Sequence, residues 1–185
     1  FDVSVIGLRR RIGKWFDVRG KDVLDLGSGI GDLCRLAQEQ GAASITGVNL
    51  SADEIAFART QTTANFVCQD IGSYLEQCPA ESIDTVFALN ILEHLDKDAL
   101  VRVLEGALRV LRGGGQLIAM VPNATSPFGG MNRYWDITHY TAFTPSSVMQ
   151  LTRLTGFDES VDFRECAPIP HGFVSALRYL LWQCI

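Results

Sequence analysis

Short apolar runs alternate with helical patterns along most of this chain. Turn and capping residues separate them, as Ser51 and Glu54 do at the start of one helical segment. The predicted strands are residues 21–26, 44–50, 66–70, 82–90 and 116–121. The predicted helices between them are residues 32–40, 51–62, 73–77 and 98–111. Because strands and helices alternate, we expect βαβ units, hence an α/β fold whose mostly parallel sheet carries helices on both faces.

The size and composition fit one domain over residues 1–185. Hydrophobic residues make up 47% and charged residues 20%, so the chain can bury a core and is not expected to be disordered. Its formal net charge of -5 disfavours a nucleic-acid partner held by bulk positive charge. The 5 cysteines form no CxxC pair, and no apolar run is long enough to span a membrane. We therefore expect reduced thiols and a cytoplasmic location.

The expected domain has four parts. Residues 1–18 carry the pattern of an amphipathic helix, and residues 20–122 hold the alternating strands and helices. Residues 123–145 form a loop rich in Gly, Asn, Thr and aromatic residues, and a loop of this length in a compact domain usually carries function. Residues 146–185 are expected to add a helix, a sixth strand at 157–164 and a final apolar helix.

A glycine-rich turn joins the first predicted strand to its helix, with glycines at Gly27, Gly29 and Gly31. A turn of this kind binds either a dinucleotide or S-adenosylmethionine. The dinucleotide fingerprint GxGxxG requires a glycine where this chain has Asp32, whose carboxylate would repel a pyrophosphate. S-adenosylmethionine has no phosphate and carries an ammonium group, so acidic residues around the turn favour it.

The segment from Val23 to Asp32 is similar to the first motif of class I S-adenosylmethionine-dependent methyltransferases, and the resemblance extends over residues 20–122. It implies a Rossmann-like three-layer α/β/α sandwich, with S-adenosylmethionine as cofactor and S-adenosylhomocysteine as product. In that family the turn lets the backbone approach the methionine portion, and an acidic residue before it anchors the turn or the ammonium group. The residues that this motif implies as cofactor-binding are Asp25, Gly27, Ser28 and Gly29.

The resemblance implies further cofactor contacts at the ends of three other strands. The family usually places an acidic residue, which holds the ribose hydroxyls, at the position of Asn49, followed here by Leu50. Because Asn49 loses the charge-assisted hydrogen bond, we expect Asn49→Asp to tighten binding. Asp70 and Ile71 match the family's adenine-binding pair, and Asn90 matches the position that faces the methyl donor. The alternatives are a surface aspartate at 70 and a strand-end cap at 90.

His94 directly follows the predicted strand at 82–90, in a stretch that resembles the family's common LEHL sequence. Some quinone-biosynthesis O-methyltransferases of the family use two glutamates and a histidine here to bind a divalent metal. Only Glu93 and His94 match that pattern, since Asn90 replaces the first glutamate, so no metal site is expected. For His94, a structural hydrogen bond and a catalytic role both stay open.

His139 lies in the long loop, in a string that looks like the D-x-T-H-x-x-x-F-T insert of many bacterial small-molecule and glycan methyltransferases. Histidine is suited to proton removal near neutral pH. We predict that His139 is the catalytic base, that Asp136 orients it, and that Tyr134 and Trp135 form a wall for the acceptor. The alternative is a loop packed by its own aromatic residues, with Asp136 and His139 as a structural pair.

Together these features predict S-adenosylmethionine-dependent O-methylation of a small-molecule or glycan hydroxyl, as in polysaccharide biosynthesis. The alternative is a catalytically silent cofactor-binding domain with a regulatory or partner role, which Asn49 favours. A nucleic-acid acceptor is not expected, because the Asn/Asp-Pro-Pro-aromatic signature of amino-methylating enzymes is absent at residues 90–93.

The segment 172–185 has two interpretations. Its apolar helical pattern fits packing against the domain or a second subunit of a homodimer. It also resembles this region of bacterial surface-polysaccharide methyltransferases, which implies peripheral contact with a membrane near a lipid-linked glycan. Family members close the sheet with an antiparallel seventh strand. None can be placed before Ile185, so we expect a methyltransferase core with its C-terminal strand missing.

Overall fold

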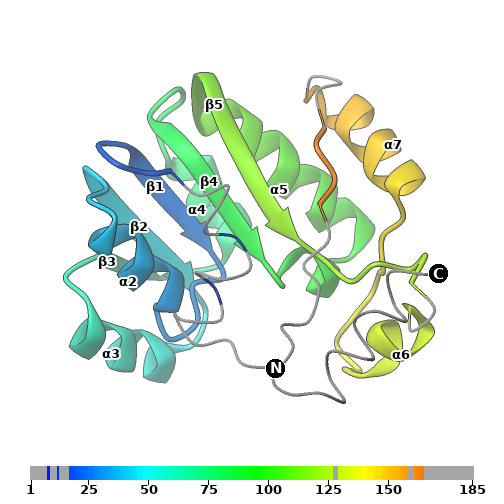
Figure 1. The fold of residues 1–185 in the computed structure, drawn as a ribbon, viewed down its shortest axis with the longest axis horizontal. Helices are drawn as coiled ribbons and strands as arrows, with labels where there is room; N and C mark the ends of the chain where they lie inside the picture. The colour runs from blue at the N-terminus through cyan, green and yellow to red at the C-terminus, as the bar shows by residue number, and fades with distance from the viewer. Residues whose placement is uncertain (1–7, 9–11, 13–16, 127–128, 158–160, 165–185) are drawn as a thin grey trace, which may run out of the picture.

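The computed structural model describes residues 8, 12, 17–126, 129–157 and 161–164 (Figure 1). Five parallel strands form one sheet in the order β3-β2-β1-β4-β5. The strands are β1 (Asp22–Leu26), β2 (Ser44–Asn49), β3 (Asn65–Cys68), β4 (Ile83–Leu89) and β5 (Leu111–Met120). The helices are α2 (Asp32–Glu39), α3 (Ala52–Gln61), α4 (Ile71–Gln77), the 3-10 helix η1 (Leu92–His94), α5 (Lys97–Val110), α6 (Gly129–Tyr134) and α7 (Pro145–Thr155).

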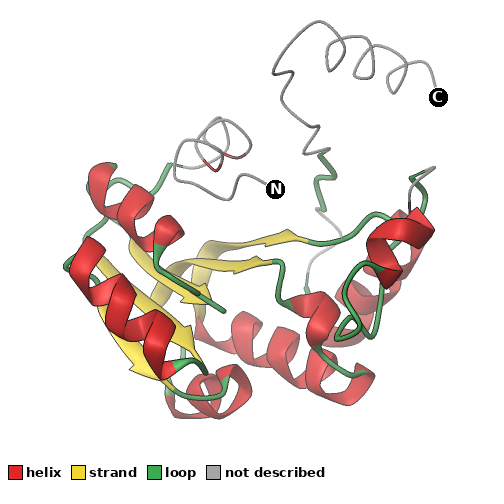
Figure 2. Cartoon of the chain, turned by 90° about the horizontal axis from the view of Figure 1, so that it is seen from below, coloured by secondary structure: helices red, strands yellow, loops and turns green. Residues whose placement is uncertain are grey.

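Helices cover both faces of the sheet (Figure 2), and the alternation of side chains along the central strands explains this arrangement. Leu24 and Val86 point to one face, where they belong to a buried cluster with side chains of α4 and α5. Val23 and Phe87 point to the other face and pack with side chains of α2. Because β1 and β4 are buried on both faces, their sequences read as apolar runs. The predicted three-layer α/β/α fold is confirmed.

The carboxyl ends of the strands lie at one edge of the sheet (Figure 1). Leu26, the last residue of β1, pairs with Val48 of β2 and with Ala88 of β4. Asn49 pairs with Cys68 at the ends of β2 and β3. The segments that follow β1, β2, β3, β4 and β5 therefore start at the same edge, which is where α/β sheets bind ligands.

β5 begins earlier than the sequence predicts. The predicted strand starts at residue 116, because three glycines before it read as a breaker, whereas β5 starts at Leu111 and includes them. A Cβ at Gly115 would lie 3.0 Å from the main-chain oxygen of Asp84 in β4. The register of β4 and β5 also shifts between Ile83 and Thr85. Glycine is therefore required here by the close approach of a neighbouring strand.

The predicted strand at 157–164 does not form in residues 157 and 161–164, the part of this range that the structure describes. Phe163 is exposed there. The guanidinium of Arg164 hydrogen-bonds to the carboxylate of Asp162 (Nε–Oδ2 2.6 Å).

Two other predicted segments are described only in part or not at all. In the predicted helix at 1–18, Leu8 and Ile12 are helical and buried, and both pack into the cluster that covers α2. The segment 172–185, with its predicted helix, lies outside the described residues. Within the parts of the chain that are described, no helix has the length and apolar character that a membrane crossing requires.

Candidate functional site

The turn after β1 leaves open space for a ligand. The main-chain oxygen of Val48 accepts hydrogen bonds from the N–H groups of Gly27 (2.9 Å) and Ser28 (3.0 Å), which fasten the turn to β2. A Cβ at Gly27 would lie 2.9 Å from Cγ1 of Ile91, so glycine is needed for the segment after β4 to approach the turn. Gly29 has φ 50°, and a Cβ there would meet no atom within 4 Å. The backbone at Gly29 is therefore accessible.

Two buried polar groups belong to this turn. Asp25, in β1, is 3% exposed, and the thiol of Cys34 on α2 donates to its Oδ2 at 3.5 Å. Burial raises the pKa of Asp25 to about 7, and the hydrogen bond from the thiol offsets this only in part. The Ser28 hydroxyl is buried and has no hydrogen-bond partner among the described residues. Because burial disfavours the Asp25 carboxylate unless a cation lies nearby, this position suits the ammonium group of an amino acid.

At the end of β2, Asn49 contacts Glu54, an acidic residue that the sequence pattern assigns to a helix capping box. Nδ2 of Asn49 donates to Oε2 of Glu54 at 2.6 Å. The N–H of Glu54 is capped by the Ser51 hydroxyl at 3.3 Å, as predicted, but its carboxylate extends toward Asn49. The amide at 49 is therefore accompanied by a carboxylate from the first turn of α3. Sequence spacing could not reveal this, because the capping box already explains Glu54.

Asp70 and Ile71 lie at the start of helix α4 and not at the end of β3. β3 ends at Cys68, and Asp70 is the N-cap of α4, with Oδ1 accepting from the N–H of Ser73 at 2.9 Å. Ile71 is buried in the core cluster that includes Leu24. By contrast, Leu50, after β2, is 71% exposed. Leu50 therefore offers more apolar surface to a ligand at this edge than Ile71 does.

Asn90 follows β4 in the left-handed region, with φ 53°. Its N–H donates to the main-chain oxygen of Met120 at 2.9 Å, which fixes it against the end of β5. A non-glycine residue in this conformation is uncommon, and such residues cluster at functional sites. The chain then turns so that Ile91 packs over Gly27.

The long loop after β5 is fastened to the segment after β4. The main-chain oxygen of Glu93 in η1 accepts from the N–H groups of Tyr140 (2.7 Å) and Thr141 (3.3 Å). The Glu93 side chain is 2% exposed, and its Oε2 has no hydrogen-bond partner among the residues described. Burial raises the pKa of Glu93. These contacts bring the predicted catalytic loop next to His94.

The two predicted catalytic histidines lie together. The rings of His94 and His139 pack edge to face, with centroids 4.7 Å apart. Nδ1 of His94 lies 2.8 Å from the Thr138 hydroxyl, which donates in turn to Asp136 Oδ1 at 2.6 Å. Nδ1 of His139 lies 3.1 Å from the main-chain oxygen of Asn132. Burial, with a smaller contribution from His139, lowers the pKa of His94, which favours its neutral form.

This arrangement corrects the predicted role of Asp136. The carboxylate of Asp136 accepts from both the hydroxyl and the N–H of Thr138, so through Thr138 it orients His94. His139 donates its main-chain N–H to the Asp136 main-chain oxygen at 3.2 Å, while its ring faces Asn132. A spacing of three residues in a loop suggested a side-chain pair, but the turn at Asp136 directs its carboxylate back to its own backbone.

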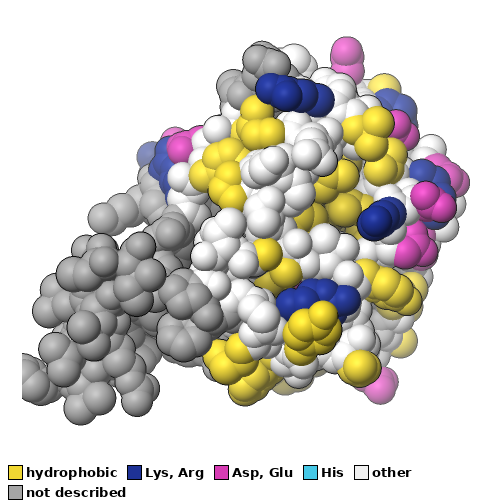
Figure 3. Space-filling model, turned by 90° about the vertical axis from the view of Figure 1, so that its right-hand side faces the viewer, with side chains coloured by type: hydrophobic (Ala, Val, Ile, Leu, Met, Phe, Trp, Pro, Cys, Tyr) yellow, Lys and Arg dark blue, Asp and Glu magenta, His cyan; other side chains and the backbone are white. Residues whose placement is uncertain are grey.

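The predicted acceptor wall is an exposed surface. Tyr134 is 79% and Trp135 82% exposed, and hydrophobic side chains form several patches on this side of the molecule (Figure 3). The Arg133 guanidinium lies 5.1 Å from the Tyr134 ring centroid and donates to the Tyr140 main-chain oxygen at 2.8 Å. Tyr134 lines a hollow of about 430 Å³ together with Arg133, whereas Trp135 does not line it.

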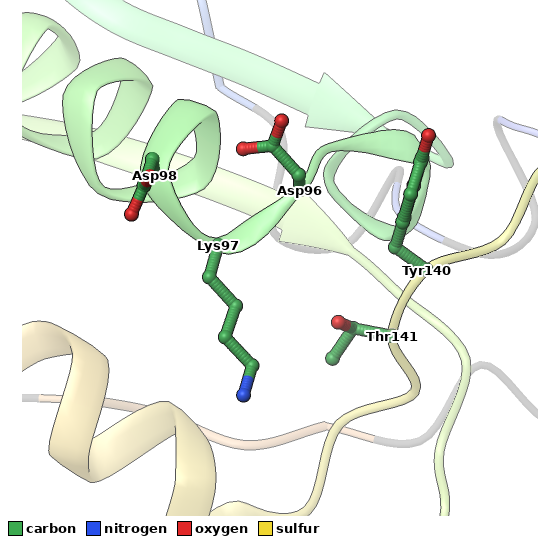
Figure 4. Close-up of a pocket in the computed structure, with 5 residues that line it drawn as sticks. All are labelled: Asp96, Lys97, Asp98, Tyr140 and Thr141. Atoms are coloured by element: carbon green, nitrogen blue, oxygen red, sulfur yellow. The ribbon is translucent and has the colours of Figure 1, made fainter.

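A second hollow, of about 320 Å³, lies between the start of α5 and the loop. Asp96, Lys97 and Asp98 line it from α5, and Tyr140 and Thr141 line it from the loop (Figure 4). Residues of the glycine turn line neither hollow. The candidate cofactor residues at the turn and the strand ends are therefore separate from both hollows.

The comparisons with known proteins agree with this geometry. A family model described as "Methyltransferase domain" matches residues 23–115, half of the chain. The ubiquinone biosynthesis O-methyltransferase of Neisseria meningitidis serogroup C (strain 053442) is 33% identical over 93 residues, covering 46% of this chain and 39% of that protein. The chain thus spans about two fifths of the length of that curated relative.

Solved structures share the fold. A SAM dependent methyltransferase from Archaeoglobus fulgidus superposes with a TM-score of 0.75 and 26% identity, over 84% of this chain and 70% of that chain. The [4+2]-cyclase SpnF has the same fold, with a TM-score of 0.63 and 24% identity over 82% of this chain and 55% of that chain. Fold alone therefore does not define the reaction.

The fold and the glycine turn define an α/β domain that binds a cofactor at the carboxyl edge of its sheet. With the family match, the conclusion is more specific: the chain belongs to the class I S-adenosylmethionine-dependent methyltransferase family. The open space over Gly29 and the buried carboxyl group of Asp25 fit the methionine portion of that cofactor.

Cofactor affinity is expected to depend on the ionisation of Asp25. Its carboxylate form attracts an ammonium group, so affinity for S-adenosylmethionine should increase as the pH rises through the Asp25 pKa of about 7. Calorimetry between about pH 6 and pH 7.5 stays below the usual pKa of an α-amino group. Asp25→Asn should abolish the increase, whereas an equal increase in that variant would show that another group titrates.

Glu54 is expected to contribute to cofactor binding together with Asn49. Glu54→Gln should weaken S-adenosylmethionine binding about tenfold, the effect of a lost charge-assisted hydrogen bond of about 1.5 kcal/mol. Asp53→Asn removes a charge from the same helical turn and is the matched control. Asn49→Asp would place a second carboxylate beside Glu54 and should not tighten binding, contrary to the expectation from sequence. Tighter binding by Asn49→Asp would contradict the role of Glu54.

Proposed function

We propose that this chain transfers a methyl group from S-adenosylmethionine to a hydroxyl group of a small-molecule or glycan acceptor. The observation that carries the proposal is the cluster of Glu93, His94 and His139, at the edge of the sheet where the glycine turn also lies. A hydroxyl acceptor needs a proton acceptor beside the methyl donor, because its proton must leave as the new bond forms.

The cofactor-binding residues divide along the edge of the sheet. Asp25, Ser28 and the backbone at Gly29 are proposed to hold the methionine portion. The amide of Asn49 and the carboxylate of Glu54, joined at 2.6 Å, would hold the ribose hydroxyls. The adenine is proposed to bind at Asp70, with the exposed Leu50 and part of Ile71 beside the ring. Asn90 then faces the methyl group.

When bound, S-adenosylmethionine supplies a methyl group on a positively charged sulfur. The acceptor oxygen would form a bond to the methyl carbon while the carbon–sulfur bond breaks. The electron pair of the broken bond would stay on sulfur, which gives S-adenosylhomocysteine. The hydroxyl proton passes to Nε2 of His139, which is available because Nδ1–H donates to the Asn132 oxygen at 3.1 Å. Alignment of the reacting atoms supplies much of the rate.

The exposed rings of Tyr134 and Trp135 support an acceptor with a ring or apolar face. Tyr134 is the last residue of α6 and Trp135 follows it, and both rings are exposed. Tyr134 also lines the hollow that Arg133 and Tyr140 line. Aromatic rings give a large apolar contact area at low entropic cost. A sugar ring fits such a surface. Contact of residues 172–185 with a membrane or second subunit, and a cytoplasmic location, stay proposals that rest on sequence.

A catalytically silent cofactor-binding domain is the second candidate, since Asn49 replaces the acid that the family usually has. The carboxylate of Glu54 beside Asn49 weakens this argument, because the missing charge is present within hydrogen-bond distance. Release of S-adenosylhomocysteine on adding hydroxyl acceptors would select the enzyme. Cofactor binding without release across sugar nucleotides, lipid-linked oligosaccharides and phenols would select the silent domain.

His139→Ala is expected to keep cofactor binding and to lose turnover. Removing a general base typically costs about 100-fold to 10,000-fold in rate, while His139 is not among the proposed cofactor contacts. Turnover with an identified acceptor and calorimetry with S-adenosylmethionine separate the two effects. The matched control is His171→Ala, because His171 is not among the residues of the proposed site. Near-normal turnover by His139→Ala would refute the role of this residue.

A further inference from the structure

Three side chains from two distant segments bring potential ligand atoms together. Glu93 and His94 come from η1, and His139 comes from the loop after β5. One ligand atom from each lies within 4.8 Å of those of the other two. Glu93 is buried, and the two histidines are half-buried. The cluster is therefore partly shielded from solvent and does not lie on an open surface.

The hydrogen bonds of the two rings show which nitrogen atoms are free. The Thr138 hydroxyl gives its hydrogen to Asp136 Oδ1 at 2.6 Å, so its oxygen accepts from Nδ1–H of His94 at 2.8 Å. The main-chain oxygen of Asn132 can only accept, so it takes the hydrogen of Nδ1 in His139. In its neutral form each ring therefore carries its hydrogen on Nδ1, which leaves a lone pair on Nε2.

The carboxylate of Glu93 is the third hydrogen-bond acceptor of the cluster. Its Oε2 is buried and, among the residues that are described, has no hydrogen-bond partner. A buried polar atom without a partner costs free energy and requires an explanation such as an ion. The cluster thus joins two imidazole rings, each with a lone pair on Nε2 in its neutral form, to a buried carboxylate group. A cation would satisfy all three.

We propose that Glu93, His94 and His139 bind a divalent transition-metal ion of the Zn²⁺ type. Two imidazoles and one carboxylate form a ligand set that suits zinc and leaves a position open for a further ligand, whereas Mg²⁺ and Ca²⁺ prefer oxygen ligands alone. This set is not the pattern of two glutamates and a histidine that Asn90 breaks, because its third ligand comes from the loop. The proposal differs from the expectation from sequence that the chain has no metal site.

The surroundings of the ligands support a metal ion. Histidine ligands usually donate their second ring N–H to a carboxylate or a main-chain oxygen, which fixes the ring. His139 has such a partner in the Asn132 oxygen, and His94 has one in Thr138, which Asp136 holds in place. Two ligands about 2.1 Å from one ion are at most about 4.2 Å apart. The separations within 4.8 Å are therefore close to the range that a shared ion requires.

The site has a consequence for the proposed reaction. With the ion bound, its open position would hold and polarise an acceptor hydroxyl, which would favour release of the hydroxyl proton to water. His139 would then act as a metal ligand, and its role as the base would apply to the metal-free chain. Loss of turnover in His139→Ala is expected in either case. Metal binding itself does not depend on methyl transfer, so the two proposals can fail separately.

The test is calorimetric titration of the full chain with Zn²⁺ after treatment with a chelator, and Co²⁺ absorption as a second probe. We expect one ion per chain. Glu93→Gln and His139→Ala should each lower the affinity more than about 100-fold, and Thr138→Val about tenfold, within the range for a residue that orients a ligand. His171→Ala and Cys68→Ser, which remove another histidine and an exposed thiol, should leave the affinity unchanged.

Hydrogen exchange gives a second readout that does not depend on activity. Zn²⁺ should protect amides in residues 129–143 of the wild-type chain and not in His139→Ala, whose fold is checked by circular dichroism. Absence of Zn²⁺ binding by the wild-type chain, or equal affinity in His139→Ala, would overturn the proposal. Loss of binding in His171→Ala or Cys68→Ser would also overturn it, by placing the ion elsewhere. Zn²⁺ binding without methyl transfer would support the site and count against the proposed function alone.

Discussion

Burial of β1 on both faces is the constraint on which the rest of the structure depends. β1 lies between β2 and β4, with Leu24 in the cluster of α4 and α5 and Val23 in the cluster of α2. Parallel neighbours require a crossover helix between successive strands, so the strands all end at one edge. The glycine turn, Asn49 and Asn90 come together as a result, although no local interaction in the sequence joins them.

The loop after β5 becomes part of this edge through main-chain hydrogen bonds. The Glu93 oxygen accepts from Tyr140 and Thr141, which holds the loop whatever its side chains are. The ring of His139 is thereby brought to 4.7 Å from that of His94. The proposed cofactor side is thus built on strand ends, and the proposed acceptor side on a fastened loop. Such a division suits a family in which the cofactor is constant and the acceptor varies.

Local patterns in the sequence predicted the five strands of the sheet, the glycine turn and the positions of Asn49 and Asn90 at strand ends, but also a strand at 157–164 that does not form in the described residues. They could not predict contacts between segments. The Asn49 amide meets Glu54, and His94 meets Thr138, only because the chain folds back at the edge of the sheet. The glycines before residue 116 read as a breaker, yet β5 includes them because the Asp84 oxygen comes close to Gly115. Each of these contacts depends on which groups the fold brings close together, and residue type alone does not show this.

The central claim is that S-adenosylmethionine binds over the turn at Gly29, and Gly29→Asn tests it most directly. Asparagine tolerates a positive φ better than most residues, and a side chain there would enter space with no atom within 4 Å of its Cβ. The variant should therefore fold with an unchanged melting temperature while losing more than about tenfold in affinity, or about 1.4 kcal/mol, measured by calorimetry. Unchanged affinity in a folded Gly29→Asn chain would contradict the account.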